Sequence, residues 1–195
     1  MKKIHYSWAQ IEGACLDIAR QLSKDNWRPD YIVGISRGGL IPATLLSHYI
    51  NVPMKPLQVS LRDGGECVSD CSMAEDAFGY PRQEIHIADE TDIGAVLDAA
   101  SSLLEMPEAT GYKNILVVDD INDQGTTIAW IKKDWQSSCL PEDPDWQHVW
   151  SNNVRFATLT NNLASSEIVD YSVWEVNKAE DDCWLVYPWE EYWLK

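Results

Sequence analysis

The run from Ile115 to Ile128 constrains the fold of this chain more than any other stretch. It reads ILVVDDINDQGTTI: an apolar segment, two adjacent carboxylates, a short Asp/Gly/Thr loop and the first residue of a helical pattern. The apolar segment contains two β-branched valines and predicts a buried parallel strand. A strand followed at once by a loop and a helix is typical of open α/β sheets, in which ligands bind beyond the carboxyl ends of the strands.

The residues of this loop fit a phosphorylated sugar. Gly125 lets the backbone approach a ligand closely, and Thr126 and Thr127 offer hydroxyls beside the free N–H groups of a helix N-terminus. Asp119 and Asp120 offer carboxylates to a diol, a metal ion or both. A strand that ends in an N-capping Asp cluster would explain either half of the run alone, but it is a poorer explanation of both halves together.

A second strand, loop and helix with the same design lie nearer the N-terminus. Residues 31–35 predict a buried strand, and residues 40–50 predict a helix with Pro42 in its first turn, where proline is tolerated. The loop between them consists of Ser36, Arg37, Gly38 and Gly39. An arginine, a hydroxyl and close-approaching glycine backbone can together bind an anion. A plain turn with a solvent-exposed arginine is the alternative, and the other phosphate-type loop in the same chain weakens it.

The rest of the chain completes an α/β pattern. We expect helices over 7–24, 92–106 and 128–137, and strands over 56–61, 84–88, 154–159 and 171–176. The polar segment 62–81 suits a mobile loop or lid, and we expect 139–151 to be a loop. The predicted architecture is a mostly parallel, twisted sheet with helices on both faces.

The length and the net charge of the chain limit the functions it can have. A chain of 195 residues predicts one domain with a good core. The formal net charge of −16 argues against nucleic acid and anionic membrane surfaces as partners. The sequence shows no signal peptide and no apolar span of about 20 residues, so we expect a cytoplasmic protein.

Both loops resemble those of the type I phosphoribosyltransferases. The run 115–128 is similar to their signature loop, with Gln124 in place of the usual Thr or Ser. The run from Ser36 to Leu40, with Pro42 after it, resembles the pyrophosphate loop of the xanthine-guanine and hypoxanthine branch. The resemblance implies one domain over 1–195, comprising a core over about 1–160, a small C-terminal hood over about 161–195 and a flexible loop over about 62–81.

The C-terminal segment resembles the base-binding hood of the same branch. Trp184 is followed by apolar residues and then by Pro188, Trp189 and Glu190. An indole face can stack on a flat base, and a carboxylate can accept from an amino group or a ring N–H. Core tryptophans on an edge strand are the alternative. The family places a lysine near the end of the preceding strand, where it faces the purine 6-oxo group, and Asn161 occupies that position here.

The resemblance implies transfer of 5-phosphoribosyl from 5-phosphoribosyl diphosphate (PRPP) to hypoxanthine, guanine or xanthine, with release of pyrophosphate, as in purine salvage. The implied catalytic residues are Asp123, as general base, and Arg37. The implied ligands of the ribose and 5′-phosphate are Asp119, Asp120, Asp123, Gln124, Gly125, Thr126 and Thr127. Those of pyrophosphate are Ser36, Arg37, Gly38 and Gly39, and those of the base are Asn161, Trp184, Leu185 and Glu190. Mg²⁺ is the implied cofactor, held by Asp119 and Asp120 directly or through water, and we expect a homo-oligomer, either a dimer or a tetramer.

Two other functions stay open at this point. A regulator of the same fold could sense PRPP or a nucleotide without catalysis, and an enzyme of the same fold could act on another base. Gln124 and Asn161 are the departures that allow the regulator. Arg82 is a further candidate for the pyrophosphate, although Arg62 and Arg82 are equally consistent with solvated surface cations.

Overall fold

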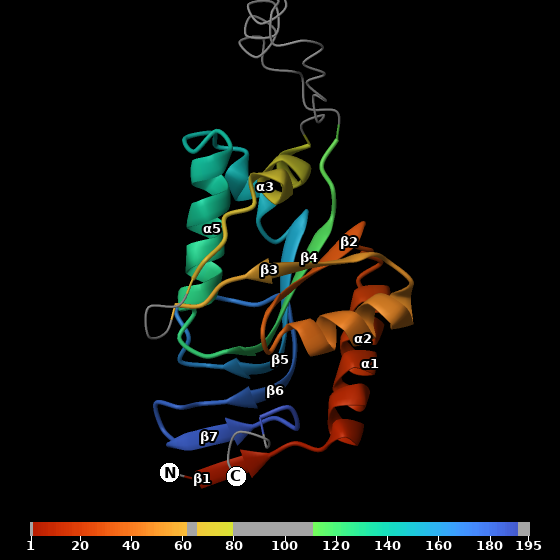
Figure 1. Ribbon diagram of the computed structural model, residues 1–195, viewed down its shortest axis with the longest axis vertical. Helices are drawn as coiled ribbons and strands as arrows, with labels where there is room; N and C mark the ends of the chain where they lie inside the picture. Colours follow the sequence, from red (N-terminus) through yellow and green to blue (C-terminus); the bar gives the residue numbers. More distant parts are fainter. Residues whose placement is uncertain (1, 62–65, 80–110, 191–195) are drawn as a thin grey trace, which may run out of the picture.

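The computed structural model of the chain describes residues 2–61, 66–79 and 111–190 (Figure 1). The strands are β1 (Lys2–His5), β2 (Tyr31–Ser36), β3 (Met54–Gln58), β4 (Ile115–Asn122), β5 (Val154–Asn162), β6 (Tyr171–Val176) and β7 (Cys183–Val186). The helices are α1 (Trp8–Lys24), α2 (Leu40–Ile50), α3 (Cys71–Phe78), α5 (Thr126–Ser138) and α6 (Trp146–Val149).

Five strands form the main sheet in the order β3-β2-β4-β5-β6, and every neighbouring pair is parallel. The register places Val33 of β2 beside Val117 of β4, and Val117 beside Phe156 of β5. Because the strands share one direction, their carboxyl ends meet at one edge of the sheet. The loops that follow β2 and β4 therefore lie next to each other at this edge, as the sequence predicts.

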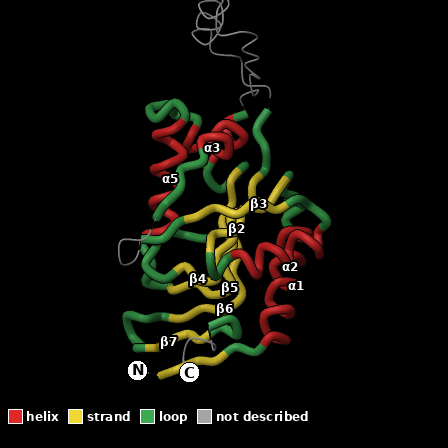
Figure 2. The backbone as a smooth tube through the Cα atoms, viewed as in Figure 1, coloured by secondary structure: helices red, strands yellow, loops and turns green. Residues whose placement is uncertain are grey.

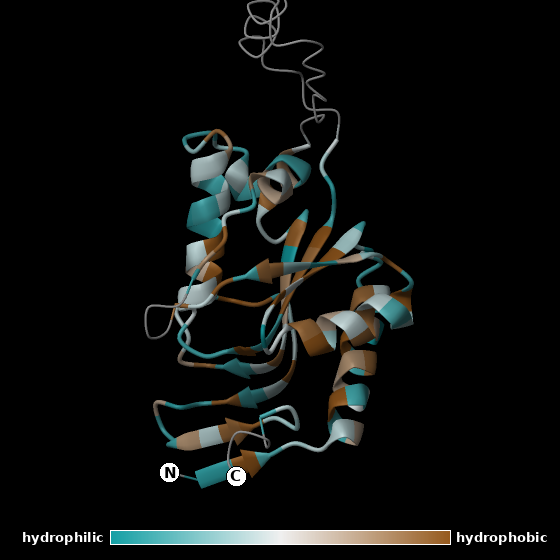
Figure 3. Cartoon of the chain, viewed as in Figure 1, coloured by the Kyte–Doolittle hydropathy of each residue, from teal (hydrophilic) through white to brown (hydrophobic). Residues whose placement is uncertain are grey.

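Helices cover both faces of the main sheet (Figure 1). Val33 and Val117 belong to a buried cluster with α3 and α5, whereas Ile32 and Leu116, their chain neighbours, belong to a cluster with α1 and α2. This alternation follows from the period of two residues along a strand. A sheet buried on both faces needs nearly continuous apolar strands, and hydrophobic residues accordingly concentrate in the central strands (Figure 3).

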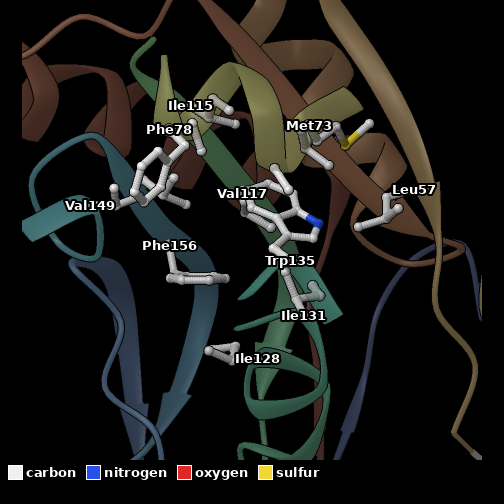
Figure 4. Close-up of a cluster of buried hydrophobic side chains, with 14 of the residues drawn as sticks. Leu57, Met73, Phe78, Ile115, Val117, Ile128, Ile131, Trp135, Val149 and Phe156 are labelled. Atoms are coloured by element: carbon white, nitrogen blue, oxygen red, sulfur yellow. The ribbon is translucent and has the colours of Figure 1, made fainter. Parts of the chain in front are cut away.

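The cluster beneath α5 is built around Trp135, which is fully buried (Figure 4). Phe156 and Val117 of the sheet, Ile131 of the helix and Met73 of α3 lie around it. Burial of a large aromatic side chain is one of the strongest single contributions to a core. The cluster fixes α5, and with it the helix N-terminus at the carboxyl edge of the sheet.

The predicted fold class is confirmed, but two segments predicted to be loops contain helices. Residues 71–78 of the segment 62–81 form α3, which buries Met73 and Phe78 in the core. Residues 146–149 of the segment 139–151 form α6, in which Trp146 is buried. In both segments the apolar residues are few and lie among acidic and polar ones, so the tertiary contacts that bury them are not evident from local composition.

The hood also differs from the prediction. Strand β6, which we expected in the hood, is the edge strand of the main sheet. The hood is a separate parallel sheet in which β7 pairs with β1, with Ile4 opposite Leu185 (Figure 2). Strand β1 has only four residues, and so short a segment has no pattern from which its pairing with β7 could be predicted.

Part of the sequence prediction concerns residues that the structure does not describe. The predicted strand 84–88 and helix 92–106 lie outside the described residues, as do Arg62 and Arg82. Within the described ranges, no helix combines the length and the apolar character that a membrane span requires.

Candidate active site

A cleft of about 1650 Å³ lies over the carboxyl edge of the main sheet, and the hood forms part of its wall. Residues from the ends of β2, β3 and β4, from the start of α5 and from β7 line it. The predicted site residues that line this cleft are Ser36, Arg37, Gly38, Asp119, Asp120, Asp123, Gln124, Gly125, Thr126, Thr127, Trp184, Leu185 and Glu190. Two predicted residues, Gly39 and Asn161, do not line it.

The loop after β2 fits closely against β4. A Cβ atom on Gly38 would lie 1.9 Å from the Oδ2 atom of Asp120, and one on Gly39 would lie 2.3 Å from the carbonyl oxygen of Val118. A side chain at Gly39 would collide with backbone, and one at Gly38 would force the Asp120 carboxylate to move. Gly38 thus lets the loop reach the carboxylate, while Gly39 packs beneath the loop and allows Arg37 to be held at the cleft. The peptide bond between Ser36 and Arg37 is cis.

The phosphate-type loop ends in the first turn of α5. Strand β4 continues through the acidic pair to Asn122, and α5 begins at Thr126, two residues earlier than predicted. Gly125 is the N-cap residue, with a φ of 85°, a conformation that favours glycine. The N–H groups of the first helical turn have no partners within the helix, and Thr126 and Thr127 line the cleft beside them, an arrangement that suits an anion.

A layer of polar side chains supports this loop from the side of β5. The Nδ2 atom of Asn122 donates to Oδ1 of Asn161 at 2.9 Å, and the Ser165 hydroxyl donates to Oδ1 of Asn122 at 2.9 Å. The Ser166 hydroxyl donates to the carbonyl oxygen of Gln124 at 2.9 Å. These bonds hold both ends of the loop in place, since Asn122 is 2 % exposed and stands where the loop leaves β4.

This layer corrects the prediction for Asn161. We expected its amide to face the base, but the side chain is bonded to Asn122 and takes no part in the wall of the cleft. The resemblance places Asn161 near the carboxyl end of a strand, and the structure has it there in β5, but the direction of its side chain could not be predicted from that position. Asn161 supports the phosphate-type loop instead.

Asp120 connects this loop region to the hood. The Tyr187 hydroxyl donates to the Asp120 carbonyl oxygen at 3.0 Å, and the Trp189 indole interacts with the Asp120 carboxylate by a hydrogen bond. Burial raises the pKa of Asp120 to about 6, with the nearby Glu190 carboxylate adding to the rise and hydrogen bonding with Asp119, with the Ile121 backbone and with the Trp189 indole opposing it. Burial likewise raises the pKa of Tyr187 well above its usual value. Asp120 is therefore seated between Gly38 and the hood.

Stacked aromatic rings hold the hood in this position. Tyr187 and Trp189 are parallel, with centroids 5.0 Å apart, and Tyr6 stacks on Tyr187 at 5.4 Å. Trp174 of β6 stacks on the other side of Tyr6 at 4.2 Å. The stack joins the N-terminal segment, the main sheet and the C-terminal segment, so the hood does not depend on the pairing of β1 and β7 alone.

Trp184 is the most exposed of the three aromatic residues that the C-terminal segment contributes to the cleft, the others being Tyr187 and Trp189. It is 46 % exposed, whereas its neighbour Leu185 is 6 % exposed. Glu190 also lines the cleft, and its Oε2 atom accepts from the Tyr187 N–H at 3.3 Å. An exposed indole and a carboxylate in the wall of one cleft suit a flat heterocycle with N–H groups at its edge.

One residue of the cleft was missed by the sequence analysis. Lys178, in the turn between β6 and β7, places its Nζ atom 2.9 Å from Oδ1 of Asp123. Among the described residues that line the cleft, Arg37 and Lys178 are the only cations, and they face five carboxylates from Glu66, Asp119, Asp120, Asp123 and Glu190. A lysine in a polar, acidic turn has no distinguishing motif, and only its closeness in space to Asp123 gives it importance.

Acidic residues are frequent in the cleft, but no protein-only metal cage is evident. No group of three or more His, Cys, Asp or Glu side chains within residues 2–61, 66–79 and 111–190 is arranged to hold a metal ion. A hard cation at this site would take carboxylate oxygens from the strand end together with oxygens of its substrate.

Known proteins resemble this chain along nearly its whole length. A family model described as "Phosphoribosyl transferase domain" matches residues 6–194. The hypoxanthine-guanine phosphoribosyltransferase of Schizosaccharomyces pombe is 25 % identical over 201 residues, which cover 96 % of this chain and 89 % of that protein. The xanthine-guanine phosphoribosyltransferase of Idiomarina loihiensis is 24 % identical, with coverage of 97 % and 88 %.

A solved structure gives the same result. The purine phosphoribosyltransferase from Pyrococcus horikoshii superimposes with a TM-score of 0.60 at 25 % identity, and the match covers 98 % of this chain and 96 % of that one. The agreement extends over the sheet, the helices and the hood rather than one motif.

Proposed function

The chain belongs to the phosphoribosyl transferase domain family and is a phosphoribosyltransferase, and we propose that it transfers the 5-phosphoribosyl group of PRPP to a 6-oxopurine. The relatives it resembles are purine phosphoribosyltransferases. The observation that carries the proposal is that both phosphate-type loops and the exposed indole of Trp184 face one cleft. Purine salvage is the corresponding metabolic role.

The reaction exchanges one bond for another at C1′ of the ribose. The bond from C1′ to the pyrophosphate oxygen breaks, and a bond from C1′ to a ring nitrogen of the purine forms. The transition state then has the character of a ribosyl cation, with negative charge developing on the departing pyrophosphate. The purine loses a ring N–H proton in the process, so the products are a nucleoside monophosphate, pyrophosphate and a proton.

The loop after β2 is suited to the departing group. Arg37 carries a permanent positive charge, and the backbone of Ser36 and Gly38 lies at the cleft. Donors that are fixed before the reaction stabilise developing charge without reorganisation, and they are commonly the largest electrostatic contribution to catalysis. We assign this loop to pyrophosphate.

The loop after β4 is suited to the sugar phosphate. The N-terminus of α5 with Thr126 and Thr127 would hold the 5′-phosphate. Asp119 would hold the ribose hydroxyls, and Asp123 is the candidate base for the purine N7 proton. Because its carboxylate packs on Gly38, Asp120 is better suited to fixing the pyrophosphate loop against the strand end.

Mg²⁺ is the proposed cofactor. It prefers oxygen ligands and usually binds through one or two carboxylates together with substrate phosphates. Asp119 and Asp120 offer such carboxylates in the cleft. When bound, Mg²⁺ would neutralise part of the charge of the diphosphate.

A turnover assay tests the proposal. The protein, PRPP and Mg²⁺ are incubated with hypoxanthine, guanine, xanthine or adenine in turn, and nucleotide and pyrophosphate are quantified. We expect equal amounts of both products with at least one 6-oxopurine. PRPP binding by calorimetry without turnover of any base would instead favour a sensor, and no binding at millimolar PRPP would exclude the proposed sugar-phosphate site.

A further inference from the structure

We infer that Asn162, at the carboxyl end of β5, is a positioning residue that fixes the carboxylate of Asp123 for proton transfer. The inference rests on the proposed function and deepens it, since it names a residue that acts through the proposed base. Asn162 is 5 % exposed and does not line the cleft. It contacts both the loop 123–127 and the turn between β6 and β7.

The side-chain amide of Asn162 uses every hydrogen-bonding position it has. Its Oδ1 atom accepts from the backbone N–H groups of Ala164 at 3.2 Å and of Lys178 at 3.0 Å. Its Nδ2 atom donates to the carbonyl oxygen of Asp123 at 2.8 Å and lies 3.5 Å from Oδ1 of the same residue. An amide offers two acceptor and two donor positions. Because the N–H groups can only donate and the carbonyl oxygen can only accept, these partners fix the orientation of the amide.

The contacts of the Asp123 carboxylate converge on one of its two oxygens. The Nζ atom of Lys178 lies 2.9 Å from Oδ1, and Nδ2 of Asn162 approaches the same atom. Within residues 2–61, 66–79 and 111–190, Oδ2 of Asp123 forms no hydrogen bond and no ion pair. Asp123 lines the cleft, and its side chain is 29 % exposed. Oδ2 is therefore the oxygen that is left to a ligand.

A carboxylate held in this way meets the geometric requirement for a general base. A base must lie within hydrogen-bond reach of the proton that it takes, and a third group commonly orients it. One oxygen of Asp123 is anchored and the other is available, so the carboxylate has its direction before the substrate binds. In the proposed reaction the N7–H bond of the purine breaks, its electron pair stays in the ring, and an O–H bond forms at Oδ2.

A purely structural role for Asn162 makes a different prediction. If the amide only ties the hood turn to the loop 123–127, its loss should weaken all nucleotides equally. The quantity that separates the two roles is the ratio of affinities for 9-deazainosine 5′-monophosphate and inosine 5′-monophosphate, measured by calorimetry. The 9-deaza compound has carbon at position 9 and keeps a proton on N7, whereas N7 of inosine monophosphate carries none. The ratio therefore reports how well the Asp123 carboxylate accepts from N7.

The size of the ratio follows from the type of bond. A hydrogen bond that involves a charged group changes an equilibrium constant by roughly 10- to 100-fold. An N7–H group donates such a bond to the carboxylate, whereas an unprotonated N7 offers it only a second acceptor. We expect the wild type to bind the 9-deaza nucleotide at least about tenfold more tightly than inosine monophosphate.

Asn162→Asp is the main variant, because it keeps the oxygen that accepts from two backbone N–H groups and replaces the donor to Asp123 by a second oxygen. Asn114→Asp is the matched control, since the Asn114 amide donates to the Arg28 carbonyl oxygen at 3.1 Å and does not line the cleft. We expect Asn162→Asp to lower the affinity ratio at least about fivefold and kcat with hypoxanthine at least about tenfold, with the control within about twofold. Lys178→Met removes the other donor to Oδ1 at a partly exposed site and should lower the same ratio.

A double-mutant cycle adds a second test. If Asn162 acts through the Asp123 carboxylate, Asn162→Asp should lower kcat less than about twofold further in an Asp123→Asn background.

The outcomes separate this inference from the proposed function. Equal losses of affinity for both nucleotides in Asn162→Asp, or fully additive losses of kcat in the cycle, would overturn the inference alone. An unchanged affinity ratio in Lys178→Met would do the same even if Asn162→Asp failed to fold. A wild-type protein that makes nucleotide from no purine would overturn the proposed function and this inference with it.

Discussion

The two sides of the cleft are built in different ways. The phosphate side consists of two short loops, 36–39 and 123–127, each of which follows its own strand and precedes its own helix. The side that we propose for the base includes Lys178, Trp184 and Glu190, and an aromatic stack that reaches back to Tyr6 holds it in place. The first side is local in sequence, whereas the second depends on contacts between distant segments.

This difference has a functional consequence. A loop between a strand end and a helix start is positioned by the sheet itself, so its ligand is a group that every substrate of the cleft shares. The hood is a small separate sheet, and changes in its turns can alter the base that is bound without disturbing the main core. The predictions below test whether the chemistry is carried by the phosphate side and the choice of base by the hood.

The largest effect is expected for Arg37→Ala on the phosphate side. Removal of one fixed donor to developing charge typically costs about 100- to 1000-fold in kcat. Binding of the product nucleotide should change far less, because it contains no pyrophosphate. The rates are measured with saturating PRPP, and the nucleotide affinity is measured by calorimetry. Arg20→Ala, on the exposed surface of α1, is the control. Equal losses in rate and in nucleotide affinity would contradict the assignment of Arg37 to the pyrophosphate.

The next effect concerns Asp120, at the junction of the two sides, and is measured as stability. Its pKa is raised to about 6 in the folded protein, above the usual value of about 3.9. The folded protein thus binds this proton more tightly than the unfolded chain does, and ionisation of Asp120 costs stability as the pH rises through 6. Asp120→Asn should be more stable than wild type at pH 7.5 by up to about 3 kcal/mol.

This gain should shrink as the pH falls below 6, to about 1 kcal/mol at pH 4.5, and should disappear only below about pH 3, where the Asp120 carboxyl is protonated both in the folded protein and in the unfolded chain. Urea unfolding of the Mg²⁺-free proteins at pH 7.5 and 4.5 measures it. Asp181→Asn, on the exposed surface of the hood, is the control and should stay within about 0.5 kcal/mol at both pH values. A variant that is less stable than wild type at pH 7.5 would show that the contacts of Asp120 outweigh its burial.

The sequence predicted where the loops 36–39 and 123–127 lie, for a physical reason. Apolar runs, glycines and caps specify a strand, a loop and a helix within about fifteen residues, and the ends of parallel strands then bring the loops together. The structure places Ser36 to Gly38 and Asp123 to Thr127 at one cleft. The local pattern did not predict that the Asp120 carboxylate packs on Gly38. That contact depends on how closely the two loops approach each other.

The base side was predicted in part. Trp184 and Glu190 were found because a tryptophan and a Pro-Trp-Glu run form a recognisable pattern, and both line the cleft. The partner strand β1 and Lys178 were missed, and Asn161, which was predicted to face the base, is bonded to Asn122 and does not line the cleft. Successive residues of a strand point to opposite faces of the sheet, so an error of one residue in register assigns a side chain to the wrong face. The register is set by the pairing with neighbouring strands.

A smaller effect is expected for Trp184→Ala in the hood. Stacking on an aromatic ring contributes roughly 1–3 kcal/mol for nucleobases in single-strand binders, so KM should rise about tenfold or more for every purine. The hypoxanthine-to-adenine ratio of kcat/KM should not change, because every base has a π-face. Tyr49→Ala, which removes an exposed ring from α2, is the control. Loss confined to one base would mean that Trp184 contributes specificity rather than a general platform.

The smallest effect is expected for Asn161→Lys, which places a cation where the sequence alone suggested that one was missing. The side chain is bonded to Asn122 and does not line the cleft, so the new ammonium should not reach the base. The hypoxanthine-to-adenine ratio of kcat/KM should stay within about twofold of wild type. PRPP affinity should fall modestly, because Asn122 loses a hydrogen bond worth about 1 kcal/mol beside the phosphate-type loop. Asn161→Ala removes the same bond without adding a charge and serves as the control. A shift toward hypoxanthine in Asn161→Lys and not in Asn161→Ala would place residue 161 at the base after all, and the division between the two sides of the cleft would have to be redrawn through β5.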